Sequence, residues 1–301
     1  FYKAYKQNVL HHSLIAYISS STQINGMSKN AFESYLFTDG KPLALTSLDK
    51  SDAAVMKIGT KTVGGNVVPD TVMSIKKILD IRDKRLSQTI DTALCYVGRG
   101  FTRFGTGISM TSSTGYGVSK YDNKSLDNMF RNQTNANFTH APIFWLAVVY
   151  LQYAEACAEL GTITQSDLDQ SINKLRSRAG IPPLSVNVGY SDPANNMGVS
   201  DLIWEIRRER RNELMFDNWT RYWDLIRWHQ LDKLDSSLHP DILLGANIVK
   251  DPYNRVVPRV GNYINGTKGK TRQFNPKHYW YPIPSDQISL NPQLVQNPGW
   301  K

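Results

Sequence analysis

The clearest helical pattern of this chain lies in the segment Trp204-Glu-Ile-Arg-Arg-Glu-Arg-Arg-Asn-Glu-Leu-Met-Phe216. Ile206 and Leu214 fall on one side of a 3.6-residue helix, and Ser200 stands where it can cap the helix start. Opposite charges three and four residues apart favour pairing within one helix. We therefore predict a helix whose charges form a structural ladder, in preference to a patch that grips phosphates. The ladder comprises Arg207, Arg208, Arg210, Arg211, Glu205, Glu209 and Glu213.

A second apolar helix face follows this segment directly. Trp219, Tyr222, Trp223 and Ile226 recur at helical spacing. Large aromatic side chains on such a face are usually buried. We interpret them as core residues, so that the two helices form interior scaffolding.

Another pair of helices is predicted upstream. Pro142 suits the first position of a helix, and Gly161 is typical of a helix end. The next helix begins at Thr164, has Asp167 at the capping-box position, and ends at Gly180. The chain thus contains two helical hairpins, but their spacing exceeds that of a plain tetratricopeptide array.

The chain divides into three regions by pattern. Residues 1–140 are loop-rich and mixed, with one helix expected near Val72–Ile81, and residues 141–234 hold the hairpins. Residues 235–301 are rich in proline and polar residues. Because alternate prolines in Tyr279-Trp280-Tyr281-Pro282-Ile283-Pro284 forbid a helix, we predict an extended wrap whose aromatics lie against the helical body.

The composition is that of a folded globular protein. Of 301 residues, 41% are hydrophobic and 20% are charged, and the formal net charge is +9. This charge could favour nucleic acid, anionic lipid or an acidic ligand, and it does not choose among them. No apolar run approaches the ~18 residues of a membrane-spanning helix. Cys95 and Cys157 are expected to be free thiols.

Signatures of enzymes and metal sites are missing from the sequence. It has no H-E-x-x-H, G-x-S-x-G or Walker motif and no cysteine and histidine cluster at zinc spacing. His11 and His12 lack carboxylate or thiolate companions, so we interpret them as surface imidazoles. The sequence predicts no catalytic residues, no metal site and no cofactor.

Several segments together resemble the SusD/RagB family. Arg207-Arg-Glu-Arg-Arg-Asn-Glu-Leu-Met-Phe216, followed by Trp219-Thr-Arg-Tyr-Trp-Asp-Leu-Ile-Arg-Trp228, resembles a helix pair of that family. Tyr281-Pro-Ile-Pro-Ser-Asp-Gln-Ile-Ser-Leu-Asn-Pro292, with Gln296-Asn-Pro-Gly-Trp300, resembles its closing motif. Shorter matches occur at Thr38-Asp-Gly-Lys-Pro42, Arg82-Asp-Lys-Arg-Leu86, Leu151-Gln-Tyr-Ala-Glu-Ala156 and Leu175-Arg-Ser-Arg-Ala-Gly180.

This resemblance implies a mainly α fold, a tetratricopeptide-like superhelix with a loop-rich, irregular ligand-binding lobe and few short strands. It implies a non-catalytic lipoprotein on the surface of the outer membrane, which binds an oligosaccharide or another nutrient and serves a SusC-like TonB-dependent transporter. The family's N-terminal half has no counterpart in this sequence. We therefore expect a C-terminal portion, whose lipid anchor lies outside it.

The candidate ligand-binding residues follow Cys95. A sugar site needs aromatic platforms beside hydrogen-bonding groups. This loop alternates aromatics and arginines among glycines that permit open turns. We predict ligand contact by Tyr96, Arg99, Phe101, Arg103 and Phe104. Alternatively, Phe101 and Phe104 fold back onto the helices.

Two other functions remain open from the sequence. The net charge and the partial match of Arg99-Gly-Phe101 to an RNA-binding motif indicate a nucleic-acid binder. Thr102 and Arg103 do not fit that motif. A peptide-binding helical-repeat scaffold would use the concave face of the hairpins. We expect no nucleic-acid partner.

Overall fold

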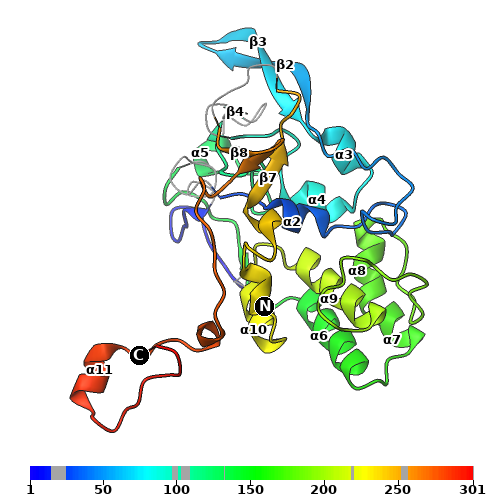
Figure 1. Ribbon diagram of the computed structural model, residues 1–301. Coiled ribbons are helices and arrows are strands. Elements are labelled where there is room, and N and C mark those ends of the chain that lie inside the picture. Colours follow the sequence, from blue (N-terminus) through cyan, green and yellow to red (C-terminus); the bar gives the residue numbers. More distant parts are fainter. Residues whose placement is uncertain are drawn as a thin grey trace.

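The computed structural model describes residues 1–14, 25–96, 101–102, 109–131, 133–217, 220–251 and 257–300. Helices of the middle of the chain gather on one side of the molecule (Figure 1), and small sheets with short helices form the other. A hydrophobic cluster fills each side. The fold is therefore largely helical with few strands, as predicted. The superhelical repeat and the three-part division stay predictions.

Four helices build the helical side, and all contribute to one core. Leu151, Ala154, Leu168 and Ile206 are at most 1% exposed and pack together in this core. The helices are α6 (Leu146–Glu159), α7 (Gln165–Gln170), α8 (Ile172–Ala179) and α9 (Asp201–Glu213).

Local sequence chemistry sets most ends of these helices. Thr164 caps α7, and its capping box with Asp167 is present as predicted. Ser200 accepts a hydrogen bond from the Ile203 backbone N–H at the start of α9, also as predicted. The single helix expected from Thr164 to Gly180 is wrong, because Ser171, with φ −126° and ψ −95°, separates α7 from α8.

Gly180 ends α8 in the left-handed conformation, with φ +71°. A Cβ atom at this position would lie 2.9 Å from Cε of Lys84. We expect Gly180→Ala to lower the free energy of unfolding by about 1–2 kcal/mol, because a non-glycine residue in this region is strained. Urea unfolding would measure the loss. Gly189→Ala, with φ +74° in open space, has the same backbone strain without the contact to Lys84, so we expect a loss that is similar or smaller; an unchanged stability in Gly180→Ala would contradict the cap.

The expected helix start at Pro142 is wrong. Ala141–Pro142 forms β6, which pairs with β1 (Tyr2–Lys3), and α6 begins only after its N-cap residue Trp145. Pro142 fits an edge strand because it has no N–H to donate. The end of the helix before Gly161, where φ is +69°, is confirmed.

A long β-hairpin opens the second side of the molecule. β2 (Val55–Val63) pairs in antiparallel register with β3 (Asn66–Ser74), and Gly64 and Gly65 form the turn with positive φ. The helix expected over Val72–Ile81 is therefore wrong in its first part. Its last part is correct, since α3 spans Lys76–Asp80.

Short elements surround the core beneath this hairpin. Tyr35, Tyr96 and Tyr116 are fully or almost fully buried there. The short helices and strands are α2 (Lys29–Glu33), α4 (Lys84–Thr89), α5 (Asn128–Arg131), β4 (Phe101–Thr102), β5 (Ser109–Met110), β7 (Leu244–Asn247), β8 (Arg259–Val260) and β9 (Tyr263–Asn265). Three of them, in the order β7-β9-β8, form a sheet.

Helix α10 (Thr220–Arg227) lies beside α9 and leads into two short 3-10 helices, η1 (Leu231–Leu234) and η2 (Pro240–Leu243). Leu225 is buried in a small core with Met197. Trp223 is 54% exposed, so its assignment to the core was wrong, whereas Tyr222 is half-buried. Trp219 lies outside the described residues.

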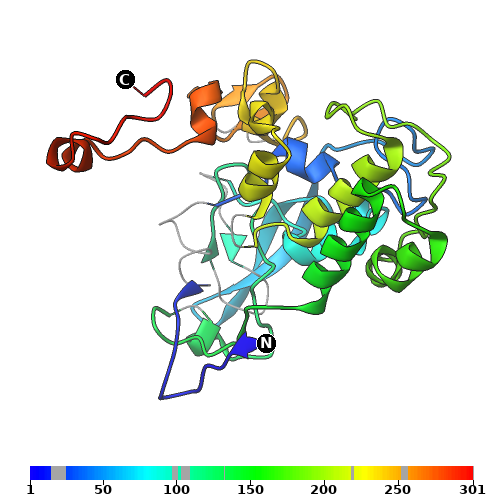
Figure 2. The same ribbon diagram turned by 90° about the horizontal axis from the view of Figure 1, so that it is seen from below.

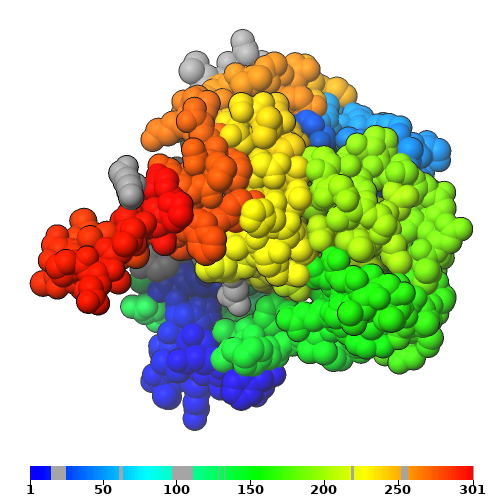
Figure 3. Space-filling model, turned by 60° about the horizontal axis from the view of Figure 1, so that its bottom comes forward, coloured from blue at the N-terminus to red at the C-terminus, as the bar shows by residue number. Residues whose placement is uncertain are grey.

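The C-terminal segment leaves the body instead of wrapping it (Figure 2). Tyr279, at the end of η3 (Pro276–Tyr279), stacks on His229 with ring centroids 4.1 Å apart. Beyond it, Trp280 and Tyr281 are 60% and 67% exposed, and α11 (Ser285–Leu290) projects outward (Figure 3). The predicted wrap is therefore wrong from residue 280 onward, because both rings are mostly exposed and Tyr281 touches the body through its hydroxyl, 3.3 Å from that of Tyr222.

No described helix is both long and apolar enough to pass through a bilayer. Cys95 is buried, Cys157 is half-buried, and both are free thiols as expected.

Candidate functional site

Only part of the loop predicted to bind ligand is described. Tyr96 is fully buried, and its hydroxyl donates a hydrogen bond to Asp251. In this conformation Tyr96 supports the base of the loop and has no surface for a ligand. Phe101 begins β4, while Arg99, Arg103 and Phe104 lie outside the described residues. Ligand contact by this loop stays a prediction.

Three arginines of α9 are buried, and they pair mainly with other elements. Arg207 contacts Glu159 of α6 at 3.0 Å, and Arg210 contacts Asp224 of α10 at 2.8 Å. Arg208 alone has a partner within the helix, Glu205 at 3.1 Å. The predicted intrahelical ladder is therefore mostly wrong. Since Arg207, Arg208 and Arg210 are 6–8% exposed, they offer no surface to a nucleic-acid backbone.

Glu209 is the acidic centre of this network. Its carboxylate is fully buried, 2.9 Å from Arg85 of α4 and 3.2 Å from Arg176 of α8. Arg85 also pairs with Asp83 at 2.6 Å. Burial alone would lower the pKa of Arg85, but Glu209 and Asp83 together raise it well above its ordinary value. The network thus fixes α9 against α4 and α8, and it positions the remaining arginines.

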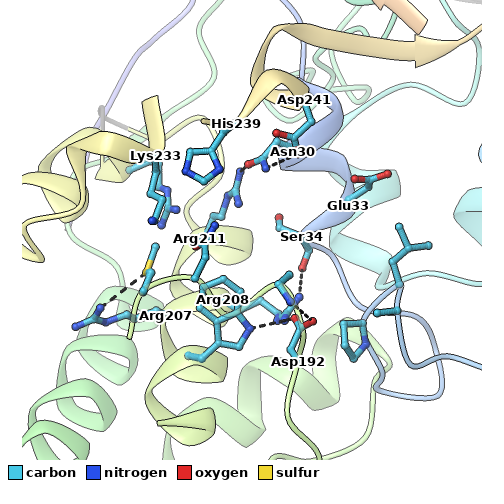
Figure 4. A pocket seen from close by; sticks show the side chains of 18 residues that line it. Asn30, Glu33, Ser34, Asp192, Arg207, Arg208, Arg211, Lys233, His239 and Asp241 are labelled. Atoms are coloured by element: carbon cyan, nitrogen blue, oxygen red, sulfur yellow. Dashed lines mark hydrogen bonds and ion pairs between the residues drawn. The ribbon is translucent and has the colours of Figure 1, made fainter. Parts of the chain in front are cut away.

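A cavity of about 370 Å³ lies over α9 (Figure 4). We call it the arginine cavity because α9 and α10 supply four arginines to its wall. The other lining residues come from α2, the loops 42–44 and 192–197, η1 and η2. The lining comprises Asn30, Glu33, Ser34, Pro42, Leu43, Ala44, Asp192, Ala194, Asn196, Met197, Trp204, Arg207, Arg208, Arg211, Arg221, Lys233, His239 and Asp241.

Two of these arginines have no acidic partner among the described residues. Arg211 extends toward Asn30 in Figure 4 and donates a hydrogen bond to its Oδ1 at 2.7 Å, but it forms no ion pair. Arg221 lies 5.8 Å from the ring centroid of Trp228 and has neither a hydrogen bond nor an ion pair within the described chain. Both guanidinium groups therefore keep unused donors.

The carboxylates of the cavity are largely committed to other groups. Asp192 pairs with Arg208 and accepts a hydrogen bond from Trp204 Nε1 at 3.1 Å. Glu33 pairs with Lys29. Asp241 has no ion pair among the described residues, and it accepts a hydrogen bond from Asn30 Nδ2 at 2.6 Å. Among the described residues, the lining thus holds two cations and one carboxylate that form no ion pair.

Burial and like charge both act on the unpaired arginines. Burial, with Arg208 nearby, lowers the pKa of Arg211 to about 10, against the opposing effect of Asp241. Burial, followed by the charge of Arg211, lowers the pKa of Arg221 well below its ordinary value. An anion beside either group would oppose this shift and raise the pKa again.

Part of the remaining wall is apolar. Pro42, Leu43 and Met197 line the cavity, as does the indole of Trp204, whose ring lies 5.5 Å from the guanidinium carbon of Arg208. Apolar walls with a few convergent polar groups are typical of small-molecule sites. Within the described chain, no group of three or more His, Cys, Asp or Glu side chains is placed to hold a metal ion.

The sequence did not predict this cavity, although one signal was present. Arg207 and Arg211 have no acidic residue three or four positions away in the helix, so an intrahelical ladder could not have paired them. Asn30 and Asp241, which meet Arg211, are far from it in the sequence.

Comparison with known proteins gives both a family and a fold. The model of the SusD family matches residues 17–300. Among solved structures, the chain is similar to one named selenomethionine BT4246, with a TM-score of 0.61 and 21% identity, over 91% of this chain and 46% of that one. No curated protein matches.

A second solved structure, a SusD superfamily protein from Parabacteroides distasonis ATCC 8503, has 16% identity and a TM-score of 0.43, over 100% of this chain and 49% of that one. The chain spans about half the length of these two structures.

Proposed function

This chain belongs to the SusD family, and on that basis we propose that it binds an oligosaccharide or another nutrient without altering it, and delivers the ligand to a TonB-dependent transporter. The family match over residues 17–300 is the observation that carries this proposal. We further propose that the partner is a SusC-like transporter and that the protein lies on the surface of the outer membrane, attached by a lipid.

The arginine cavity supports binding of a compact polar ligand. A sugar ring presents C–H groups that pack on apolar side chains and hydroxyls that accept hydrogen bonds. Leu43 and Met197 provide the first kind of surface, and Arg211 provides donors. The cavity therefore has the composition that a sugar site requires.

The loop after Cys95 is the second surface of the proposed site. Its described part shows that the ends of the loop are fixed, since β4 pairs with β5 and the buried Tyr96 forms a bridge to Ser112. Recognition residues commonly lie on loops that a rigid scaffold holds. We place Arg99, Phe101, Arg103 and Phe104 at the ligand on the grounds of residue type.

Affinity gel electrophoresis with a panel of polysaccharides tests this function. We expect at least one glycan to retard the wild-type chain. The double variant Phe101→Ala/Phe104→Ala should lose most of that retardation, because truncating an aromatic platform costs contact area. Phe144→Ala is the control, since Phe144 is 71% exposed and far from that loop in the sequence.

Two outcomes would count against the proposal in different ways. Equal retardation of the double variant and the wild type would remove the loop from the site. If no glycan retards the wild type and no TonB-dependent transporter copurifies with it, the proposed function is wrong.

A further inference from the structure

We infer that the arginine cavity binds the anionic group of an acidic sugar, a carboxylate or a sulfate, at Arg211 and Arg221. This inference rests on the proposed function and specifies its class of ligand.

The charge balance of the cavity is the first argument. Five cationic side chains line it, and three of them have acidic partners: Arg207 with Glu159, Arg208 with Asp192, and Lys233 with Asp232. Arg211 and Arg221 have no such partner among the described residues, and Asp241 is the one unpaired carboxylate of the lining. The two unpaired arginines and the one unpaired carboxylate together leave an excess of one positive charge.

The free-energy cost of placing Arg211 and Arg221 near each other is the second argument. Bringing two cations together in a partly buried site is unfavourable unless an anion compensates them. The charge of Arg211 contributes to the lowered pKa of Arg221, so the two groups lie within electrostatic range of each other. An anion that contacts both would relieve this repulsion and satisfy unused N–H donors. Guanidinium groups bind carboxylate and sulfate oxygens well because their donors form a planar fork.

The shape of the cavity identifies the rest of the ligand. At about 370 Å³ it falls at the lower end of the ~300–1,000 Å³ of small-molecule sites. A bare inorganic anion would leave the apolar wall of Pro42, Leu43 and Met197 without contacts. A sugar unit with an acidic substituent uses both walls, with its carbon face on the apolar side and its charge on the arginines.

Isothermal titration calorimetry on the full chain tests the inference. The probes are trigalacturonate, a chondroitin sulfate disaccharide and neutral galactotriose. We expect at least one acidic probe to bind about tenfold more tightly than galactotriose, which corresponds to ~1.4 kcal/mol. Because the chondroitin sulfate disaccharide carries a carboxylate as well as a sulfate, its unsulfated counterpart is the further probe: a loss of affinity without the sulfate assigns the site to sulfate, and an unchanged affinity assigns it to carboxylate.

Two variants locate the anion. Arg221→Gln should weaken binding of the acidic probe about tenfold and leave galactotriose binding unchanged. Arg178→Gln removes the same charge from a side chain that is 55% exposed and outside the cavity, and it should change neither affinity. Because Arg221 forms no ion pair within the described residues, we expect the variant to fold, and circular dichroism would verify this.

Two results would overturn the inference. If acidic and neutral probes bind the wild type equally and Arg221→Gln changes neither, the inference is wrong while the proposed function stands. If the wild type binds none of the probes, the inference is wrong; the proposed function is also wrong only if no glycan of the wider panel binds and no TonB-dependent transporter copurifies. Should Arg221→Gln fail to fold, the wild type decides: binding of the acidic probe that does not weaken between about 50 and 500 mM NaCl would exclude the ion pair.

Discussion

Glu209→Gln is expected to lower the free energy of unfolding by about 3–5 kcal/mol, the range for breaking a buried ion pair by removing one partner. Glu209 is fully buried between Arg85 at 2.9 Å and Arg176 at 3.2 Å. Glutamine keeps the shape but not the charge. Arg85 retains Asp83, but Arg176 loses its ion pair and keeps, among the described residues, a hydrogen bond to Pro182 O at 2.7 Å. The buried charge of Arg176 then has no ion pair within the described chain, and only the longer-range attraction of Glu205 opposes its burial.

Chemical denaturation with urea would measure this loss. Glu159→Gln is the matched control, because Glu159 pairs with Arg207 at 3.0 Å while its side chain is 46% exposed. Water can replace much of that interaction, so we expect about 1 kcal/mol or less. Similar losses in the two variants would mean that Glu209 does not anchor α9 as described.

The position of α9 could be predicted from the sequence, but its partners could not. Ser200 and the period of Ile206 and Leu214 define a helix by local rules. The pairing of Arg207 with Glu159 and of Arg210 with Asp224 depends on how the helices pack. Spacing in the sequence carries no information about such contacts.

The same distinction separates correct from incorrect helix boundaries. Thr164, Gly161 and Gly180 act through their own backbone or side chain, and all three mark helix ends as predicted. Pro142 is drawn into a strand by residues 2–3, more than a hundred positions away. Val72 likewise belongs to a strand because it pairs with Lys57. Tertiary pairing overrides local preference at these two sites.

The arginine cavity lay beyond prediction for the same reason. Asn30, Arg211 and Asp241 meet there from α2, α9 and η2. The sequence showed that Arg211 had no acidic residue at helical spacing. It could not show that the side-chain amide of Asn30 would accept a hydrogen bond from that arginine.

The second large loss of stability is expected for Gly245→Ala in strand β7. A Cβ atom at Gly245 would lie 2.1 Å from the carbonyl oxygen of Thr114 and 2.6 Å from its Cα. Both are backbone atoms, so no side chain can rotate away. The same carbonyl accepts a hydrogen bond from the Ala246 N–H at 2.8 Å, which fixes how closely the two segments approach.

Relief of this clash would have to move β7 or the segment around Thr114. The first option displaces Ala246 and the second displaces Tyr116, and both residues are buried in the core beneath the hairpin. Overpacking typically costs up to about 3 kcal/mol, and we expect the upper limit here because the backbone itself must shift. We expect Gly245→Ala to lose about that much in urea unfolding. Gly198→Ala, which has φ +67° and open space around its Cβ, should lose only about 1–2 kcal/mol. A smaller loss at Gly245 than at Gly198 would show that β7 does not pack on Thr114 as closely as described.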